Sequence, residues 1–210
     1  MTRLLFSFLA LAVVALTYLF VNYYQDTYEL IPVTKEVNPA NTPITPWIDF
    51  RSPSGKFQVK FPSAPQNAKE KLVDPHTKEA REYDMYAAEG STGSIYMISL
   101  ITFDEVDTLE EQTDLLTSVM NNMVNSSKNN VLGAMDMGSF QNQQALNFTI
   151  ENGDAQIQAT AFIRDKILYV LTCVSKKISD MPTEFSYFLN SFKLISDENS
   201  SSHMKKEGAQ

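Results

Sequence analysis

Residues 51–65 read RSPSGKFQVKFPSAP, and this stretch predicts a tight turn that leads into a strand. Its FQVKF segment alternates apolar and polar residues, which is the period-two pattern of a strand with one buried face. Upstream, WIDF at 47–50 supplies a partner strand. The SPSG between them has proline at the second and glycine at the fourth position of a type I turn, so Gly55 is free to take a positive φ.

The Ser-Gly-Lys of the same stretch raises an alternative, a loop that cradles phosphate. Such a loop needs a longer glycine-rich arc that leads into a helix, as in G-x-x-x-x-G-K-[ST]. Neither the second glycine nor the helix pattern is present here. The turn is therefore favoured, and Lys56 is expected to begin the strand with its side chain in solvent.

Periodicity places further elements along the chain. Alternating patterns and turn residues predict strands at 81–89, 94–103, 131–140, 144–151, 155–164 and 166–175. Apolar residues at three- and four-residue steps predict a helix within 107–127, begun by a Thr108 and Glu111 capping box, and a second helix within 181–195. Strand 166–175 is apolar on both faces, so we expect it at the centre of the sheet. The order of strands, helix, strands and helix predicts an α+β fold around a mainly antiparallel sheet.

Two motifs at the ends of this predicted domain resemble those of the PsbP-like family, which includes a photosystem II extrinsic subunit and a Ran-binding import factor. The opening F-x-V-x-FP-x-x-P, preceded by a glycine, and the closing F-x-x-x-x-x-SF-x-L are formed here by Gly55, Phe57, Val59, Phe61, Pro62, Pro65, Phe185, Ser191, Phe192 and Leu194. The resemblance covers about residues 47–195. It implies an α/β/α sandwich used mostly as a binding or assembly module, and it carries over no catalytic residue. Bacterial envelope proteins share both motifs, so it also implies a membrane-anchored bacterial protein.

The N-terminal segment predicts one transmembrane helix. Residues 4–21 carry no charge, and at about 1.5 Å per residue such a helix just spans a hydrocarbon core of roughly 30 Å. The residues expected to contact the lipid bilayer include Leu4, Phe8, Leu11, Val14, Leu19 and Val21. Aromatic residues at its end, and the lack of a small-x-small site there, favour an uncleaved anchor over a removed signal peptide. Cleavage is the alternative, and it would leave a secreted soluble protein.

Charges that flank this segment predict its orientation. Arg3 precedes it, whereas the acids Asp26 and Glu29 follow it. Because cytoplasmic flanks carry an excess of Lys and Arg, we expect the N-terminus in the cytoplasm and the remainder outside. The chain then divides into an anchor at 1–21, a proline-bearing stalk at 22–46, the PsbP-like domain at 47–195 and a disordered tail at 196–210.

Few residues offer reactive chemistry. His76 lies in a polar turn, His203 lies in the tail, and the single cysteine, Cys173, lies in the strand that we expect to be most buried. An acidic group near the predicted helix start could hold a hard cation, although its position fits capping of the helix better: Asp104, Glu105, Asp107, Glu110 and Glu111. We therefore predict no catalytic residue, no metal site and no cofactor.

Four methionines leave two interpretations open. An adaptable binding groove and an ordinary core would both use flexible, polarisable side chains of this kind. The residues concerned are Met120, Met123, Met135 and Met137. Helical spacing favours the core.

Charge and organisation limit the function. Seventeen Lys and Arg against twenty-five Asp and Glu give a net charge of −8, the wrong sign for a nucleic-acid surface. We expect the extracytoplasmic domain to bind another envelope protein or to act in assembly, without catalytic activity. The alternative is a small-ligand-binding or hydrolytic domain whose pocket is lined by the aromatic residues Tyr83, Tyr86, Tyr96 and Tyr169. A filled sandwich with an exposed apolar patch favours the first function, and a deep pocket with convergent polar groups favours the second.

Overall fold

The computed structural model describes residues 46–73, 80–103, 108–176 and 182–195. Its elements, in chain order, are β1 (Ile48–Arg51), β2 (Phe57–Phe61), β3 (Gln66–Val73), β4 (Ala80–Glu89), β5 (Ile95–Thr102), α2 (Leu109–Asn125), β6 (Val131–Phe140), β7 (Gln143–Asn152), β8 (Ala155–Arg164), β9 (Ile167–Lys176), α3 (Pro182–Ser191) and β10 (Lys193–Leu194). The predicted anchor, the stalk up to residue 45 and the predicted tail lie outside the described residues. Neither α2 nor α3, the helices in the described ranges, has the length and apolar character needed to span a bilayer.

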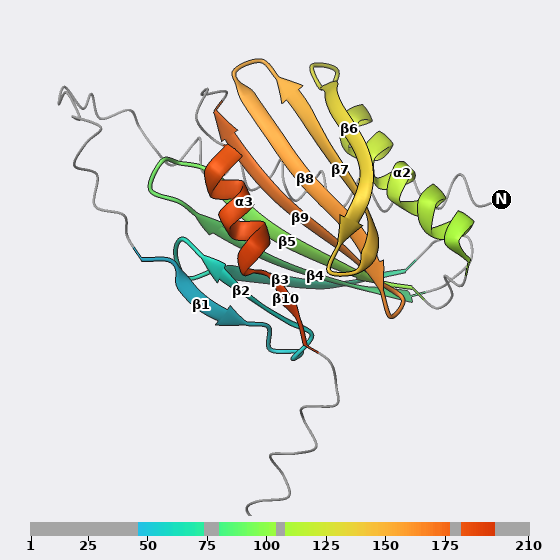
Figure 1. The fold of residues 1–210 in the computed structure, drawn as a ribbon, viewed down its shortest axis with the longest axis horizontal. Helices are drawn as coiled ribbons and strands as arrows, with labels where there is room; N and C mark the ends of the chain where they lie inside the picture. Colours follow the sequence, from blue (N-terminus) through green and yellow to red (C-terminus); the bar gives the residue numbers. More distant parts are fainter. Residues whose placement is uncertain (1–45, 74–79, 104–107, 177–181, 196–210) are drawn as a thin grey trace, which may run out of the picture.

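Two antiparallel sheets form the framework (Figure 1). The large sheet has seven strands in the order β3-β4-β5-β9-β8-β7-β6, and the small sheet has three strands in the order β1-β2-β10. Strand β9 lies between β5 and β8 and is buried along almost its whole length, as its two apolar faces predict. The prediction of a mixed α+β fold with mainly antiparallel sheets is confirmed.

Helix α2 covers one face of the large sheet and packs on β7 and β8. Its start is fixed by the predicted capping box, in which the Glu111 N–H donates to Thr108 Oγ1 at 3.1 Å and the Thr108 N–H donates to Glu111 Oε2 at 3.0 Å. Five side chains on one side of the helix are buried: Leu115, Leu116, Val119, Met120 and Met123. This apolar side, at helical spacing, holds α2 on the sheet.

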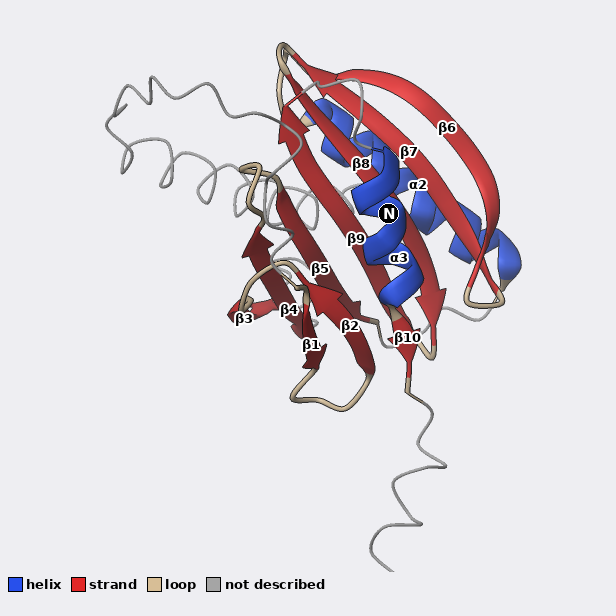
Figure 2. Cartoon of the chain, turned by 60° about the vertical axis from the view of Figure 1, so that its left-hand side comes forward, coloured by secondary structure: helices blue, strands red, loops and turns tan. Residues whose placement is uncertain are grey.

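The opposite face of the large sheet is covered by α3 and by the small sheet together (Figure 2). Here the core is rich in aromatic side chains. The ring centroids of Phe61 and Phe188 of α3 lie 5.4 Å apart. Phe162 stacks on Tyr169, with ring centroids 5.0 Å apart and an interplanar angle of 5°. Each buried aromatic ring removes a large apolar area from water, so these contacts stabilise the second layer strongly.

The small sheet differs from what the sequence patterns predict. The segment 181–195 predicts one helix, but α3 ends at Ser191 and the next residues form β10, which pairs with β2. The residues after Ser191 make hydrogen bonds to β2 in place of the bonds that a longer helix would provide. The Ile195 N–H, for example, donates to the Lys56 carbonyl at 2.9 Å. Strand β3 is likewise not predicted, since QNAKEKLV has no clear alternation of apolar and polar residues.

The turn at residues 52–55 forms as predicted. Gly55 has φ +73°, and its N–H donates to the Ser52 carbonyl at 2.8 Å. The Ser52 side chain accepts the N–H of Phe57 at 3.2 Å, which joins the corner to the start of β2. The Ser-Gly-Lys stretch is therefore a hairpin corner between β1 and β2.

Candidate functional site

The two motifs that carry the family resemblance meet in the structure although they lie at opposite ends of the domain. Leu194 of β10 is the register partner of Phe57 in β2, and Phe57 stacks on Phe192 at 5.4 Å with an interplanar angle of 21°. The Lys60 N–H also donates to Ser191 Oγ at 3.0 Å. The motif phenylalanines are all buried, so these residues form structure: Phe57, Phe61, Phe185 and Phe192.

The other motif residues occupy the ends of strands and a buried position. Val59 is buried with the phenylalanines on the inner face of β2. Pro62 directly follows β2, and Pro65 directly precedes β3. A proline suits both places because it removes one backbone donor where a strand begins or ends.

Cys173 is a buried thiol in the centre of the domain. Burial is the main reason that its pKa is raised to about 12, so it remains protonated at neutral pH. It is the register partner of Tyr96, whose hydroxyl donates to Glu184 Oε2 of α3 at 2.7 Å. This hydrogen bond ties α3 to the sheet, and the thiol beside it fills space.

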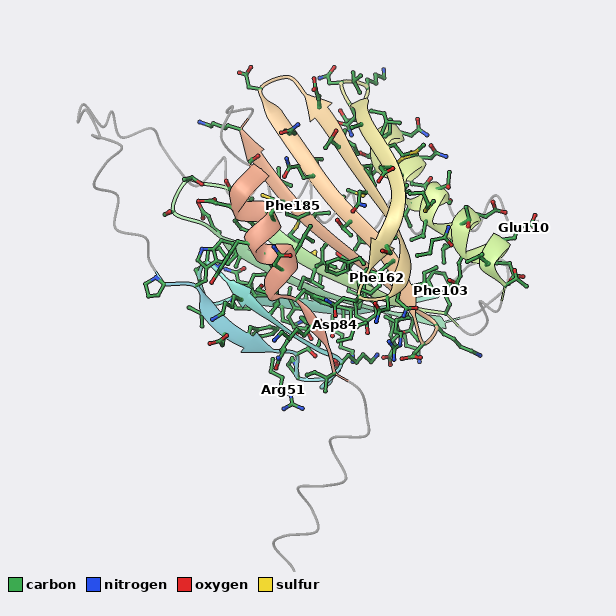
Figure 3. All side chains as sticks on the ribbon, viewed as in Figure 1. Arg51, Asp84, Phe103, Glu110, Phe162 and Phe185 are labelled. Carbon is green, nitrogen blue, oxygen red and sulfur yellow. The ribbon has the colours of Figure 1, made fainter. Side chains whose placement is uncertain are left out.

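The predicted acidic and histidine candidates do not assemble into a site in the described part of the chain. Glu110 and Glu111 lie in the first turn of α2, with Glu110 on its solvent side (Figure 3). The remaining candidates lie outside the described residues: His76, Asp104, Glu105, Asp107 and His203. Among the described residues, no group of three His, Cys, Asp or Glu side chains is placed to hold a metal ion.

The four tyrosines proposed as a pocket lining belong to the core instead. Each is at most 2% exposed. Tyr83 packs in the cluster under α2, whereas Tyr86, Tyr96 and Tyr169 pack in the cluster under α3 and the small sheet. The sheet separates the two groups, so the four rings do not line one pocket. Burial raises the pKa of Tyr83 and that of Tyr169 to about 12.

Strand β6, at one edge of the large sheet, is exposed along nearly its whole length. Leu132, Met135 and Met137 are the register partners of Ile150, Phe148 and Leu146, which belong to the core cluster under α2. Paired residues on adjacent strands point to the same face, so these three side chains lie on the α2 side of β6. They remain 37%, 56% and 39% exposed, and we call them the β6 apolar strip.

A β-bulge interrupts β6 upstream of Met135. The register with β7 shifts between Leu132 and Met135, and the Ala134 N–H donates to the Thr149 side-chain hydroxyl at 2.8 Å. Glycine is favoured at position 133, because a Cβ there would lie 2.6 Å from Thr149 Oγ1 and would force that side chain to move. The regular part of the edge therefore runs from Met135 to Phe140.

The two edges of the large sheet differ in charge. Strand β3 carries Lys69, Glu70 and Lys71, and charged residues on an edge discourage the addition of further strands. In β6, Asp136 is the one charged residue. The β6 edge is thus the less protected of the two.

Sequence patterns find this site only in part. The four methionines separate in the structure, since Met120 and Met123 are core residues of α2 whereas Met135 and Met137 are exposed on β6. The interpretation as core is correct for the helical pair alone. Leu132 carries no signal in the sequence, because nothing local shows that its strand lies at the edge of the sheet.

Comparisons with known proteins identify the fold of this chain. No protein family model matches the sequence, and no curated protein matches it. The extracellular domain of PknH from Mycobacterium tuberculosis is 9% identical over 60% of this chain and 83% of that chain, with a TM-score of 0.32, and contributes nothing to the fold assignment. The solution structure of cyanobacterial PsbP (CyanoP) from Synechocystis sp. PCC 6803 is 11% identical and covers 78% of this chain and 99% of that chain, with a TM-score of 0.52. The chain therefore has a PsbP-like fold.

Proposed function

We propose that this chain is a single-pass membrane-anchored module whose extracytoplasmic domain binds another envelope protein through strand β6, and that it catalyses no reaction. The observation that carries the proposal is the β6 apolar strip, in which three large apolar side chains are exposed on one side of an edge strand. Contiguous exposed apolar side chains are typical of protein-binding surfaces. Methionine suits such a surface because its flexible side chain adapts to the partner.

The backbone of β6 offers a second support. From Met135 to Phe140 the strand is regular, and β7 is its one neighbour in the large sheet. Its outer N–H and C=O groups can therefore pair with an added strand. A partner strand would gain main-chain hydrogen bonds from this edge and apolar contacts from Met135 and Met137. The bulge at Gly133 limits the paired length to the part downstream of it.

Two further features support the other parts of the proposal. The uncharged segment 4–21 and the acids that follow it support an anchor with the domain outside the cytoplasm. The buried Cys173 and the four buried tyrosines support a packed core in place of a reactive site. Binding of a partner at β6 then explains why the side chains of the β6 apolar strip are exposed.

Site-specific photocrosslinking of the full-length chain in its native membrane tests the proposal. A benzoylphenylalanine replaces Met137 on β6 in one variant and Lys71 on β3 in the matched control, since Lys71 is exposed at the opposite edge of the same sheet. We expect a discrete adduct from position 137 that position 71 does not give. Adding Met135→Lys to the labelled chain should abolish this adduct, because it places a charge in the middle of the apolar contact. Identical adducts from both positions, or an adduct that survives Met135→Lys, would contradict the proposal.

A further inference from the structure

A second surface lies on the outer face of the small sheet, which covers the face of the large sheet opposite to α2 (Figures 1 and 2). A groove of about 490 Å³ runs between this face and α3. Its polar and charged lining includes Arg51, Gln58, Lys60, Tyr187, Asn190 and Lys193, and we call it the basic groove.

The register of the small sheet places two cations in one row. Arg51 of β1 pairs with Gln58 of β2, and Gln58 pairs with Lys193 of β10. Phe57 and Val59 point into the core, so the alternation of a strand directs Gln58 outward between the two cations. Adjacent strands lie about 4.8 Å apart, which puts the Cα atoms of Arg51 and Lys193 about 10 Å apart. Figure 3 shows Arg51 extending from β1 away from the body of the domain.

The charge of the groove is opposite in sign to that of the chain. Lys60 is paired with Asp49 at 3.0 Å. In the described ranges, neither Arg51 nor Lys193 has a carboxylate within ion-pair distance. Three cations against one acid give the lining a net charge of +2, on a chain whose net charge is −8. A guanidinium, an ammonium and an amide on one row can all donate to the oxygens of a phosphate group.

The position of the groove indicates which phosphate it meets. Residue 46, the first described residue, leads directly into Trp47, whose ring packs against the groove residue Tyr187, so the predicted stalk joins the domain beside this groove. Tyr187 is 46% exposed, and its ring centroid lies 5.1 Å from that of Trp47 in an edge-on contact. Basic residues beside exposed aromatic side chains are a combination that suits an anionic membrane surface.

We propose that the basic groove binds the phosphate group of an anionic lipid in the bilayer that holds the anchor. This inference rests on the membrane anchoring proposed above and is independent of binding at β6. Docked through this groove, the domain holds the small sheet toward the bilayer. The β6 apolar strip then faces away from the bilayer, because it lies on the α2 side of the large sheet and the small sheet covers the other side.

The single tryptophan of the chain provides the readout, because Trp47 lies beside Tyr187 at the rim of the groove. The full-length chain is placed in lipid nanodiscs that contain a lipid spin-labelled at its headgroup, and the quenching of Trp47 fluorescence is measured. We expect strong quenching in discs that contain phosphatidylglycerol and weak quenching in discs of phosphatidylcholine alone. Equal quenching in the two kinds of disc would overturn the proposal.

Charge variants separate the groove from general attraction to the membrane. Each basic residue near an anionic surface strengthens binding about fivefold, so Arg51→Gln with Lys193→Gln should lower the ratio of docked to undocked domain by about 30-fold. The control is Lys128→Gln with Lys176→Gln, which removes the same charge. Both control lysines lie near the hairpin between β7 and β8. Lys176 is the register partner of Ala155 at that hairpin. Asn130, two residues from Lys128, accepts a hydrogen bond from Asn152 of the same hairpin. Unchanged docking in the groove variant, or equal loss in the control, would overturn the proposal.

Two more arms separate the possible causes of failure. If inorganic phosphate releases Trp47 quenching where chloride of the same ionic strength does not, and the two kinds of disc behave alike, the groove binds free phosphate and the lipid assignment is wrong. A chain that does not elute with the discs refutes the anchor and this inference with it. Met135→Lys on β6 should leave the quenching unchanged, so a failure of the β6 proposal is seen in crosslinking alone.

Discussion

Replacing Gly133 by alanine tests how the β6 bulge is built. The new Cβ would lie 2.6 Å from Thr149 Oγ1 and 3.6 Å from the Thr149 carbonyl oxygen. The first separation is too short for a Cβ contact, so the Thr149 side chain must rotate. Its hydroxyl then leaves the Ala134 N–H, from which it accepts a hydrogen bond of 2.8 Å.

Two effects of that rotation determine how much Gly133→Ala lowers the free energy of unfolding. Loss of the hydrogen bond costs about 1 kcal/mol, and a side chain forced from its preferred rotamer costs about 1 kcal/mol more. Replacing glycine by alanine also reduces the entropy of the unfolded chain, which stabilises the folded state by about 0.4–1 kcal/mol. Gly138→Ala on the same strand shares this gain but meets its nearest atoms at 3.6 Å, an ordinary contact. Gly133→Ala should therefore be about 2 kcal/mol less stable than Gly138→Ala.

Urea unfolding followed by circular dichroism measures the difference, with the full chain kept in one detergent for all variants. A third variant isolates the cause, because Thr149→Ala removes the oxygen that Gly133→Ala would meet. In the Thr149→Ala background, Gly133→Ala should cost no more than Gly138→Ala does. Equal stability of the two glycine variants in the original background, or an undiminished cost without the Thr149 hydroxyl, would refute this account of the bulge.

Three further predictions concern buried groups. The Cys173 thiol, whose pKa burial raises to about 12, should not react with Ellman's reagent at pH 8 until the chain is unfolded, and stoichiometric labelling of the folded chain would contradict this. Burial raises the pKa values of Tyr83 and Tyr169 from 10.0 to about 12, so these tyrosines lose their protons at lower pH in the unfolded state than in the folded state. The unfolding free energy should therefore fall as the pH rises from 10.0 to about 12. A denaturation midpoint that does not change with pH over this range would contradict this. Tyr96→Phe removes the hydrogen bond to Glu184 of α3 and should lower the unfolding free energy by about 1–2 kcal/mol. The control Tyr187→Phe changes an exposed ring and should alter this free energy little. Equal effects of the two substitutions would show that the hydrogen bond contributes nothing to stability.

Local sequence patterns predicted the structure wherever the deciding residues lie within one strand, helix or turn. Strand β9 is apolar on both faces and lies at the centre of the large sheet. The capping box of α2 and the turn at Gly55 also follow from a few neighbouring residues. In each case the chemistry that decides the structure lies within one element, so the sequence shows it directly.

Features that depend on pairing between distant segments were not predictable. Strand β10 has only two residues, and it forms because β2, more than 130 positions earlier in the chain, supplies its hydrogen-bonding partner. The exposure of β6 depends on its position at the edge of the large sheet, and the alternation of residues in VLGAMDMGSF does not show that position. The two candidate surfaces are of this second kind, since both arise from strand order and register.

Binding at the β6 apolar strip is the central claim, and the affinity of the partner identified by photocrosslinking tests it most directly. The dissociation constant is measured for the full-length chain, for Met135→Lys with Met137→Lys, and for Asn121→Lys on the exposed side of α2 as a matched control. We predict that the methionine variant binds at least about tenfold more weakly, as loss of central apolar contacts requires, while Asn121→Lys binds as the original chain does. Equal affinity of all three chains would contradict the claim that the partner binds at β6.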